Sequence, residues 1–153
     1  MKRIAVGLSV LLGSLALALV AMLKLFPGDV VERTYASLDA ARQDQLFDGG
    51  WLPDVLPPST SQIHLENDLN LNTSSGSFNF SAGEWPLLQS RLTSGALTAP
   101  FVDWNDTVEG YRRTGFVPWH HTEKDGNWTS HWVFFCNHPV GRCEHFMWMR
   151  REG

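Results

Sequence analysis

The sequence predicts an α+β domain behind an N-terminal transmembrane helix, with one antiparallel sheet of about five strands and two helices. Three observations lead to this fold class. An uncharged run of twenty residues, 4–23, lies near the start of the chain. Short runs of alternating apolar and polar residues are separated by turn residues, and two stretches have helical spacing. Strands joined by tight turns pair antiparallel, so we expect a single antiparallel sheet with helices beside it.

The uncharged run, IAVGLSVLLGSLALALVAML, is long enough to cross a bilayer as a helix of about 30 Å. Pro27 ends it, because proline cannot continue the helical hydrogen bonds. A cleaved signal peptide is one alternative, although its apolar region is usually shorter and Ala16-Leu17-Ala18 lies inside this run. A buried helix of a soluble core is the other.

Lys2 and Arg3 precede the run and favour an N-terminus in the cytoplasm. We therefore expect three regions: residues 1–24 as a cytoplasmic tip and anchor, 25–50 as a juxtamembrane amphipathic helix, and 51–153 as an extracytoplasmic domain. The expected location is the inner membrane, with the lipid bilayer bound through residues 4–23 and the C-terminal domain in the periplasm or outside.

The charge balance of the exported part argues against nucleic acid as a partner. From residue 25 onward the chain has nine Lys and Arg against sixteen Asp and Glu, a net charge of −7. An acidic domain repels phosphate backbones and anionic lipid head groups. We expect this charge to serve solubility.

Residues 29–47 have helical spacing, with Val31, Tyr35 and Leu38 at steps of three and four, and Gly49-Gly50 supplies the stop. The segment GWLPDVLPPST, residues 50–60, follows. Each residue before a proline is pushed toward extended backbone, so the segment should be a stiff connector held to the core by its apolar groups. A proline-rich ligand is the alternative, but it usually has the spacing PxxP, whereas Pro53 and Pro57 are four apart.

The remaining elements follow from alternation and turn residues. We expect strands at 61–71 and 77–80 around a turn at 72–76, and then a helix from Ser81 to about residue 93 with a capping box formed by Ser81 and Glu84. Residues 94–110 should form a loop with a short strand near 101–104. Three strands should follow, at 111–121, 128–136 and 143–149.

The segment ARQDQLFDGGWLPDVLPPSTSQIHLENDLNLNTSSGSFNF, residues 41–80, resembles a group of small bacterial envelope proteins of unknown function. In that group a membrane anchor precedes a GWLP..LP.SA..I element, a strand pair and a helix. The resemblance covers about residues 1–93 and implies a bacterial, membrane-anchored protein. Ser59-Thr60 stands where the group has Ser-Ala, and no catalytic residues carry over.

The two cysteines, Cys136 and Cys143, flank a six-residue loop between two predicted strands. An antiparallel pair without hydrogen bonds brings Cα atoms to about 4.5 Å, which a disulfide allows. We therefore predict a structural disulfide, with free core thiols as the alternative. A redox-active pair would usually have the spacing Cys-x-x-Cys.

Five histidines lie late in the chain and raise the question of a metal site. If Cys136 faces Cys143, His131 and His145 point to opposite faces of the sheet, so the predicted register disperses the group. We predict neither a metal site nor a cofactor. The low-ranked candidate ligands are His120, His131 and His145.

Two sets of residues form a possible binding surface. His64, Glu66 and Asp68 are two apart on one predicted strand, so they share a face that either binds a ligand or is only the solvent side of the strand. Aromatic side chains could add contact area or pack in the core. The tryptophans predicted for this surface are Trp51, Trp104 and Trp119.

These features lead to three hypotheses. The first is a non-enzymatic envelope protein that displays an acidic domain and binds another envelope protein. The second is an immunity-type inhibitor of an exported toxin, and the third is a small periplasmic metal-dependent hydrolase that uses some of the late histidines. No sequence motif of a known catalytic site supports an enzyme.

Overall fold

The computed structural model describes residues 29–44 and 49–152. The chain divides into two compact units, Met1–Val30 and Val31–Gly153, and the second unit contains the folded domain. The predicted anchor at residues 4–23 lies outside the described residues. Within the described ranges, no helix is both long and apolar enough to cross a membrane.

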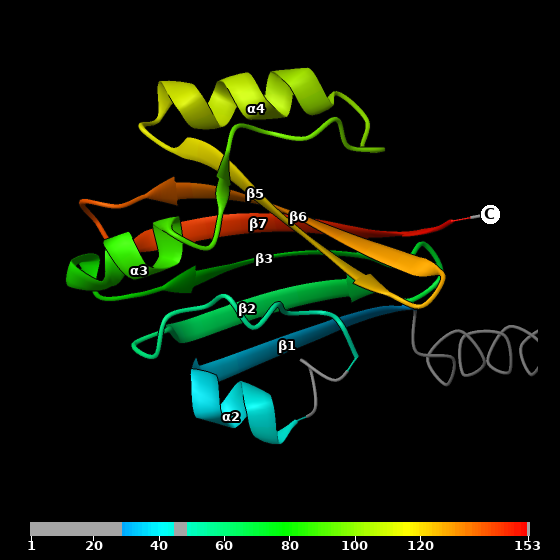
Figure 1. The fold of residues 1–153 in the computed structure, drawn as a ribbon, viewed down its shortest axis with the longest axis horizontal. Coiled ribbons are helices and arrows are strands. Elements are labelled where there is room, and N and C mark those ends of the chain that lie inside the picture. The colour runs from blue at the N-terminus through cyan, green and yellow to red at the C-terminus, as the bar shows by residue number, and fades with distance from the viewer. Residues whose placement is uncertain (1–28, 45–48, 153) are drawn as a thin grey trace, which may run out of the picture. The chain divides into compact units, whose positions relative to one another are not determined.

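The domain has one seven-stranded sheet with short helices around it (Figure 1). The strand order across the sheet is β1-β2-β3-β7-β6-β5-β4. The elements in chain order are β1 (Val30–Ser37), α2 (Leu38–Gln43), β2 (Ser61–Asp68), β3 (Thr73–Asn79), the 3-10 turn η1 (Ala82–Glu84), α3 (Trp85–Gln89), β4 (Thr93–Ser94), α4 (Trp104–Arg113), β5 (Val117–Asp125), β6 (Trp128–Asn137) and β7 (Arg142–Arg151).

The centre of the sheet is formed by segments far apart in the chain. β5, β6 and β7 follow one another as antiparallel hairpins, and β2 pairs with β3 in another. The two hairpin groups join where β3 lies antiparallel to β7, with Phe78 opposite Cys143. The fold class is therefore the predicted α+β class with one antiparallel sheet, but the described residues contain seven strands instead of about five and three short α-helices instead of two.

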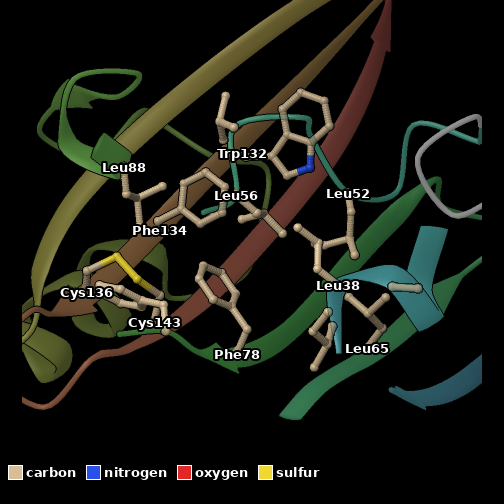
Figure 2. Packing of buried hydrophobic residues seen from close by; sticks show 14 of the residues in the cluster. Leu38, Leu52, Leu56, Leu65, Phe78, Leu88, Trp132, Phe134, Cys136 and Cys143 are labelled. Carbon is tan, nitrogen blue, oxygen red and sulfur yellow. A yellow bond between two sulfur atoms is a disulfide. The ribbon is translucent and has the colours of Figure 1, made fainter. Parts of the chain in front are cut away.

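One face of the sheet carries the main core, which we define as the cluster around Phe78, Trp132 and Phe134 (Figure 2). The connector between α2 and β2 covers this face, because Leu52, Val55 and Leu56 are buried in the same cluster. Leu38 of α2 and Leu88 of α3 complete it. The connector is therefore a structural cover of the sheet, in agreement with the packing role predicted for it.

The opposite face carries a smaller second core over β6 and β7. Trp104 and Val108 of α4 pack there against Val133, Phe135 and Trp148. The ring of Tyr111, also in α4, stacks on Phe135 with centroids 4.3 Å apart and 13° between the planes. The alternation predicted for β6 is confirmed, since its even-numbered residues from Trp132 lie in the main core and its odd-numbered residues from Val133 in the second.

Cys136 and Cys143 are joined by a disulfide, with Cα atoms 4.1 Å apart. They lie directly opposite each other in the β6–β7 hairpin, and both are buried in the main core. The bond therefore links the two central strands next to the point where β3 joins them.

The helix predicted over residues 29–47 is wrong for residues 30–37, which form the edge strand β1. Val30, Val31, Thr34 and Tyr35 are β-branched or aromatic, and such residues favour strands. Among the described residues of this stretch only Leu38–Gln43 is helical, and this helix begins where the Ser37 hydroxyl accepts a hydrogen bond from the Ala40 backbone N–H. Residues 45–48 lie outside the described ranges.

The helix predicted from Ser81 to residue 93 is shorter, and its predicted capping box is absent. The Ser81 side chain makes no capping hydrogen bond to η1. The Glu84 carboxylate instead accepts hydrogen bonds from the backbone N–H and the hydroxyl of Ser59, at 3.1 and 2.6 Å. These bonds hold the pKa of Glu84 below its usual value and fasten α3 to the end of the connector.

The strand predicted near 101–104 is also wrong, because residues 104–113 form the helix α4. Trp104, Val108 and Tyr111 recur at steps of four and three, which is helical spacing. The polar and flexible residues between them, among them Asn105, Asp106 and Gly110, have low helix propensity and conceal the pattern. The strand predicted to start at Tyr111 begins only at Val117.

Candidate functional site

The half of the sheet beside α4 forms an open polar face. α4 and the second core cover β6 and β7, while on the same side of β1, β2 and β3 the described side chains are exposed or half-buried and, apart from Val30 and Ala36 of β1, polar. The register and the alternation along these strands place the members on one side. We define the open polar face as Glu32, Thr34, His64, Glu66, Ser75 and Ser77.

His64 lies in the middle of this face and is held by side chains of β1. Its Nε2 atom is 3.5 Å from the Glu32 carboxylate, and its Nδ1 atom is 3.4 Å from the Thr34 hydroxyl. Ser77 lies directly opposite His64 in the sheet, and Glu144 lies opposite Ser77 on the other side. Because both ring nitrogens of His64 are directed at β1, the imidazole is not placed to take a proton from the Ser77 hydroxyl.

A depression of about 280 Å³ lies elsewhere, at the strand ends, and one of about 210 Å³ opens on the polar face. The rim of the second depression is set by the packing of α4, because Tyr111 reaches it while its ring stacks on Phe135. The main lining residues of this face depression are His64, Ser75, Ser77, Tyr111, Glu144 and Phe146.

The charge at the face depression is fixed by three side chains. Arg142 donates two hydrogen bonds to one oxygen of the Glu144 carboxylate, from Nε at 2.9 Å and from Nη2 at 2.7 Å. Burial raises the pKa of Tyr111, and the nearby Glu144 carboxylate raises it further while Arg142 opposes this. The phenol therefore remains a neutral hydrogen-bond donor at physiological pH. Such a set can orient a polar ligand, but it contains no activated nucleophile.

The larger depression lies where β5, β6 and β7 meet the start of the connector. Its lining combines two carboxylates, Glu123 and Asp125, with the rings of Trp128 and Trp132. Glu123 is engaged by His121, whose Nε2 atom is 2.9 Å from the carboxylate. The indole N–H of Trp132 is buried without a hydrogen-bond partner. This site is acidic and aromatic, whereas the face depression also contains hydroxyl groups and an arginine at its edge.

The three tryptophans predicted for a binding surface serve mainly to pack the domain. Trp104 was expected near a loop surface, but only 7% of it is exposed, and its indole N–H donates to the Leu97 carbonyl at 2.8 Å. Because Trp104 lies in the helix α4, its side chain is directed into the second core. Trp119 is half-buried with its ring edge-on to Trp85 at 5.3 Å, and Trp51 packs partly buried against the main core.

The predicted polar stripe on β2 is divided between two roles. His64 and Glu66 lie on the open polar face as expected. Asp68 instead shapes the turn to β3, because its carboxylate accepts the backbone N–H groups of Asn70 and Leu71, both at 3.0 Å. Within this stripe, therefore, His64 and Glu66 are the residues available to a ligand.

The low-ranked metal candidates do not form one site. His145 is buried in the main-core side of the sheet, between Phe78 and Phe134. His131 stacks on Trp148 at 5.2 Å on the opposite face, and His120 contacts the Gly95 carbonyl at 3.1 Å. Among the described residues, no three His, Cys, Asp or Glu side chains are arranged to hold a metal ion.

Sequence reasoning missed Ser75, Ser77, Tyr111 and Glu144. The first two were assigned to a turn and the start of a strand, and Tyr111 was expected in a strand. Glu144 could have been placed on the second-core side, since it follows the disulfide cysteine by one residue. The position of Ser77 beside Glu144 could not have been predicted, because the pairing of β3 with β7 joins segments that no local pattern connects.

A substitution at Trp51 separates the packing role of this residue from a recognition role. We expect Trp51→Ala to lower the free energy of unfolding by about 2–3 kcal/mol, because the half-buried ring packs on the main core through the connector. Thermal or chemical denaturation measures the loss. Trp128→Ala is the matched control, since Trp128 is exposed, and it should change stability little. Equal stability of the two variants would contradict the packing role.

A comparison with protein families matches residues 29–79 to the family described as the YbbD head domain. The match covers one third of the chain and includes β1, α2, the connector, β2 and β3. His64, Glu66, Ser75 and Ser77 lie within it, whereas Tyr111 and Glu144 lie beyond it. Comparisons with curated proteins and with solved structures found no match.

Proposed function

We propose that this chain is a membrane-anchored extracytoplasmic protein of the bacterial envelope that binds another envelope protein at its open polar face and catalyses no reaction. The observation that carries the binding role is the uneven cover of the sheet. One face is sealed by α2, α3 and the connector, and α4 covers half of the other. The remaining half, on β1, β2 and β3, presents polar side chains to solvent.

An exposed polar face alone does not indicate a binding site, because the solvent side of a sheet is polar as well. The depression in this face is therefore the stronger support for the binding role. Tyr111 supplies a neutral donor at its rim, Glu144 an acceptor, and His64 a polar imidazole ring. A few fixed polar groups around an apolar contact such as Phe146 are typical of sites that orient a ligand. The arrangement suits a polar segment of a partner protein.

The anchoring role rests on the sequence of residues 4–23 and the basic residues before it. The disulfide between Cys136 and Cys143 supports a domain outside the cytoplasm, because such bonds persist mainly in oxidising compartments. The match to the YbbD head domain states neither a location nor an activity.

Two measurements on cells test the proposal. Protease added to spheroplasts should remove the domain, whereas protease added to intact cells should not reach it. A photo-crosslinking residue at Ser75, on the open polar face, should then capture a specific envelope protein. The matched control is a crosslinker at Ser90, an exposed serine in the turn after α3 on the main-core side.

Survival of the domain in protease-treated spheroplasts would refute the location. Identical crosslinked products at Ser75 and Ser90 would refute the choice of binding face. Loss of the Ser75 product on Tyr111→Phe or Glu144→Gln would assign the contact to the face depression, and retention in both variants would place it elsewhere on the face.

A further inference from the structure

We infer that one end of the sheet contacts the bilayer surface through four apolar side chains, Val30, Leu69, Leu71 and Trp128. We call this end, formed by the start of β1, the β2–β3 turn, the β5–β6 turn and the end of β7, the tether end. The inference rests on the proposed membrane anchor. It adds a second membrane contact, made by the folded domain itself, and thereby an orientation of the domain on the membrane.

The fold brings these four residues to the same end. The strands alternate in direction, so the first residue of β1, the turn after β2, the first residue of β6 and the last residues of β7 gather there (Figure 1). The register agrees, since Trp128 pairs with Arg151 and the Met149 N–H donates to the Asn72 carbonyl beside Leu71. Asn72 and Trp128 also line the same strand-end depression.

Exposed apolar side chains are concentrated at this end of the domain. Eight large apolar residues of the described chain are exposed, and four of them are at the tether end: Val30, Leu69, Leu71 and Trp128. Single exposed apolar residues are ordinary in soluble domains, but a group at one end indicates a contact surface. Leu71, at 68% exposure, is the most exposed of the four.

The β2–β3 turn holds its two leucines outward by a fixed geometry. The Asp68 carboxylate accepts both the Asn70 and the Leu71 backbone N–H groups, and Asn72 adopts the left-handed conformation at φ 50°. The backbone N–H groups of Asn70 and Leu71 are thus satisfied within the turn. The leucine side chains need no partner inside the domain, and a bilayer surface would remove them from water.

The length of chain before β1 places this end near the membrane. Six residues, 24–29, separate the end of the apolar run at Leu23 from Val30, and fully extended they span about 20 Å. β1 itself extends for eight residues, about 26 Å, away from that point. The opposite end of the sheet therefore starts one strand length farther from the tether, and the tether end can reach the head-group layer without strain.

The charges at the tether end identify the kind of lipid contact. Lys124, Arg150 and Arg151 lie at the same end as the carboxylates of Asp68, Glu123, Asp125 and Glu152, and Lys124 is paired with Glu152, so basic residues are not in excess. Attraction to anionic lipid would require an excess of basic residues. The contact should therefore depend on insertion of apolar side chains, with Trp128 at the head-group level where indole rings are favoured.

The test uses the full chain reconstituted in phosphatidylcholine vesicles. Leu71→Cys is labelled with an environment-sensitive fluorophore and compared with Val140→Cys, labelled in the same way. Val140 is a matched control, because it is 70% exposed in the β6–β7 turn at the opposite end of the sheet. Vesicle flotation of both proteins reports the anchor independently of the label.

We expect both proteins to float with the vesicles. The label at position 71 should shift to shorter wavelength and lose about half of its emission when the lipid acyl chains are brominated, whereas the label at position 140 should not respond. Replacing up to one third of the lipid by phosphatidylglycerol should not increase the quenching at position 71, because basic residues are not in excess at this end.

Flotation with equal or absent quenching at the two positions would overturn the inference and leave the anchor intact. A spectral shift at position 71 without quenching by brominated lipid would also overturn it and indicate a protein neighbour. Failure to float would refute the anchor itself, and the inference with it.

Discussion

Gly76→Ala is expected to destabilise the domain by about 3 kcal/mol or more, because a methyl group at this position has no space in the sheet. Gly76 lies in β3 between Leu65 and His145 of the neighbouring strands. A Cβ atom added there would be 2.0 Å from the His64 carbonyl oxygen and 2.8 Å from Cε1 of His145. The nearer obstacle is backbone, so it cannot move without disturbing the pairing of β2 with β3.

Urea denaturation followed by tryptophan fluorescence measures this loss. Gly110→Ala is the matched control, since Gly110 lies in the exposed part of α4 and a Cβ atom there meets no neighbour within 4 Å. Alanine is the better helix former, so the control should gain about 0.5–1 kcal/mol. Recovery of stability in Gly76→Ala combined with His145→Ala would show that the imidazole, and not the backbone, was the obstacle.

His145→Leu is expected to remove most of the acid sensitivity of the domain. Burial, together with the nearby His64, lowers the pKa of His145 to about 4. Both ring nitrogens are buried without a hydrogen-bond partner, between the rings of Phe78 and Phe134. An apolar side chain of similar size removes these unpartnered polar atoms and the ionisable group together.

The direction of the pH effect follows from the two pKa values. In the unfolded chain His145 takes up a proton near pH 6.5, whereas in the folded domain it does so only near pH 4. Between these values the unfolded state binds more protons, so stability falls as the pH is lowered from about 6.5 to about 4. The wild-type chain should lose on the order of 3 kcal/mol from this residue over that window.

Unfolding free energies measured at pH 7, 6, 5 and 4.5 test this prediction. The variant should be at least as stable as wild type at pH 7 and more stable by about 2 kcal/mol at pH 5. A residual slope should remain, because burial and the nearby Arg150 also lower the pKa of His131. His138→Leu, at an exposed position in the β6–β7 turn, controls for loss of a histidine. Parallel pH profiles for His145→Leu and wild type would contradict the prediction.

The hairpin that carries the disulfide is the part of the fold that the sequence predicts best. The runs 128–136 and 143–149 are close in the chain, and the loop between them limits the possible registers. Opposition of Cys136 and Cys143 then fixes which residues share each face, so the opposite faces of His131 and His145 follow from alternation alone. Local pairing of this kind needs no information from the rest of the chain.

The N-terminal third shows where local pattern fails. Residues 30–37 satisfy a helical and a strand pattern at once, since Val31 and Tyr35 are four apart and also on one side of a strand. Residues 30–37 form a strand because the edge of β2 is available for pairing. Residues 104–113 show the reverse, because a helix of weak propensity forms when Trp104 and Val108 can pack on Phe135 and Val133.

The sequence by itself determined the α+β class, the acidic charge of the domain, the cysteine pair and the packing role of the connector, because these depend on composition and on neighbours close in the chain. Only the tertiary structure decided that β3 pairs with β7, that Tyr111 and Glu144 meet His64 at one depression, and that Leu69, Leu71 and Trp128 share one end of the sheet. These arrangements join residues tens of positions apart. Their free energy comes from closing long loops around a shared core, which no local pattern in the sequence records.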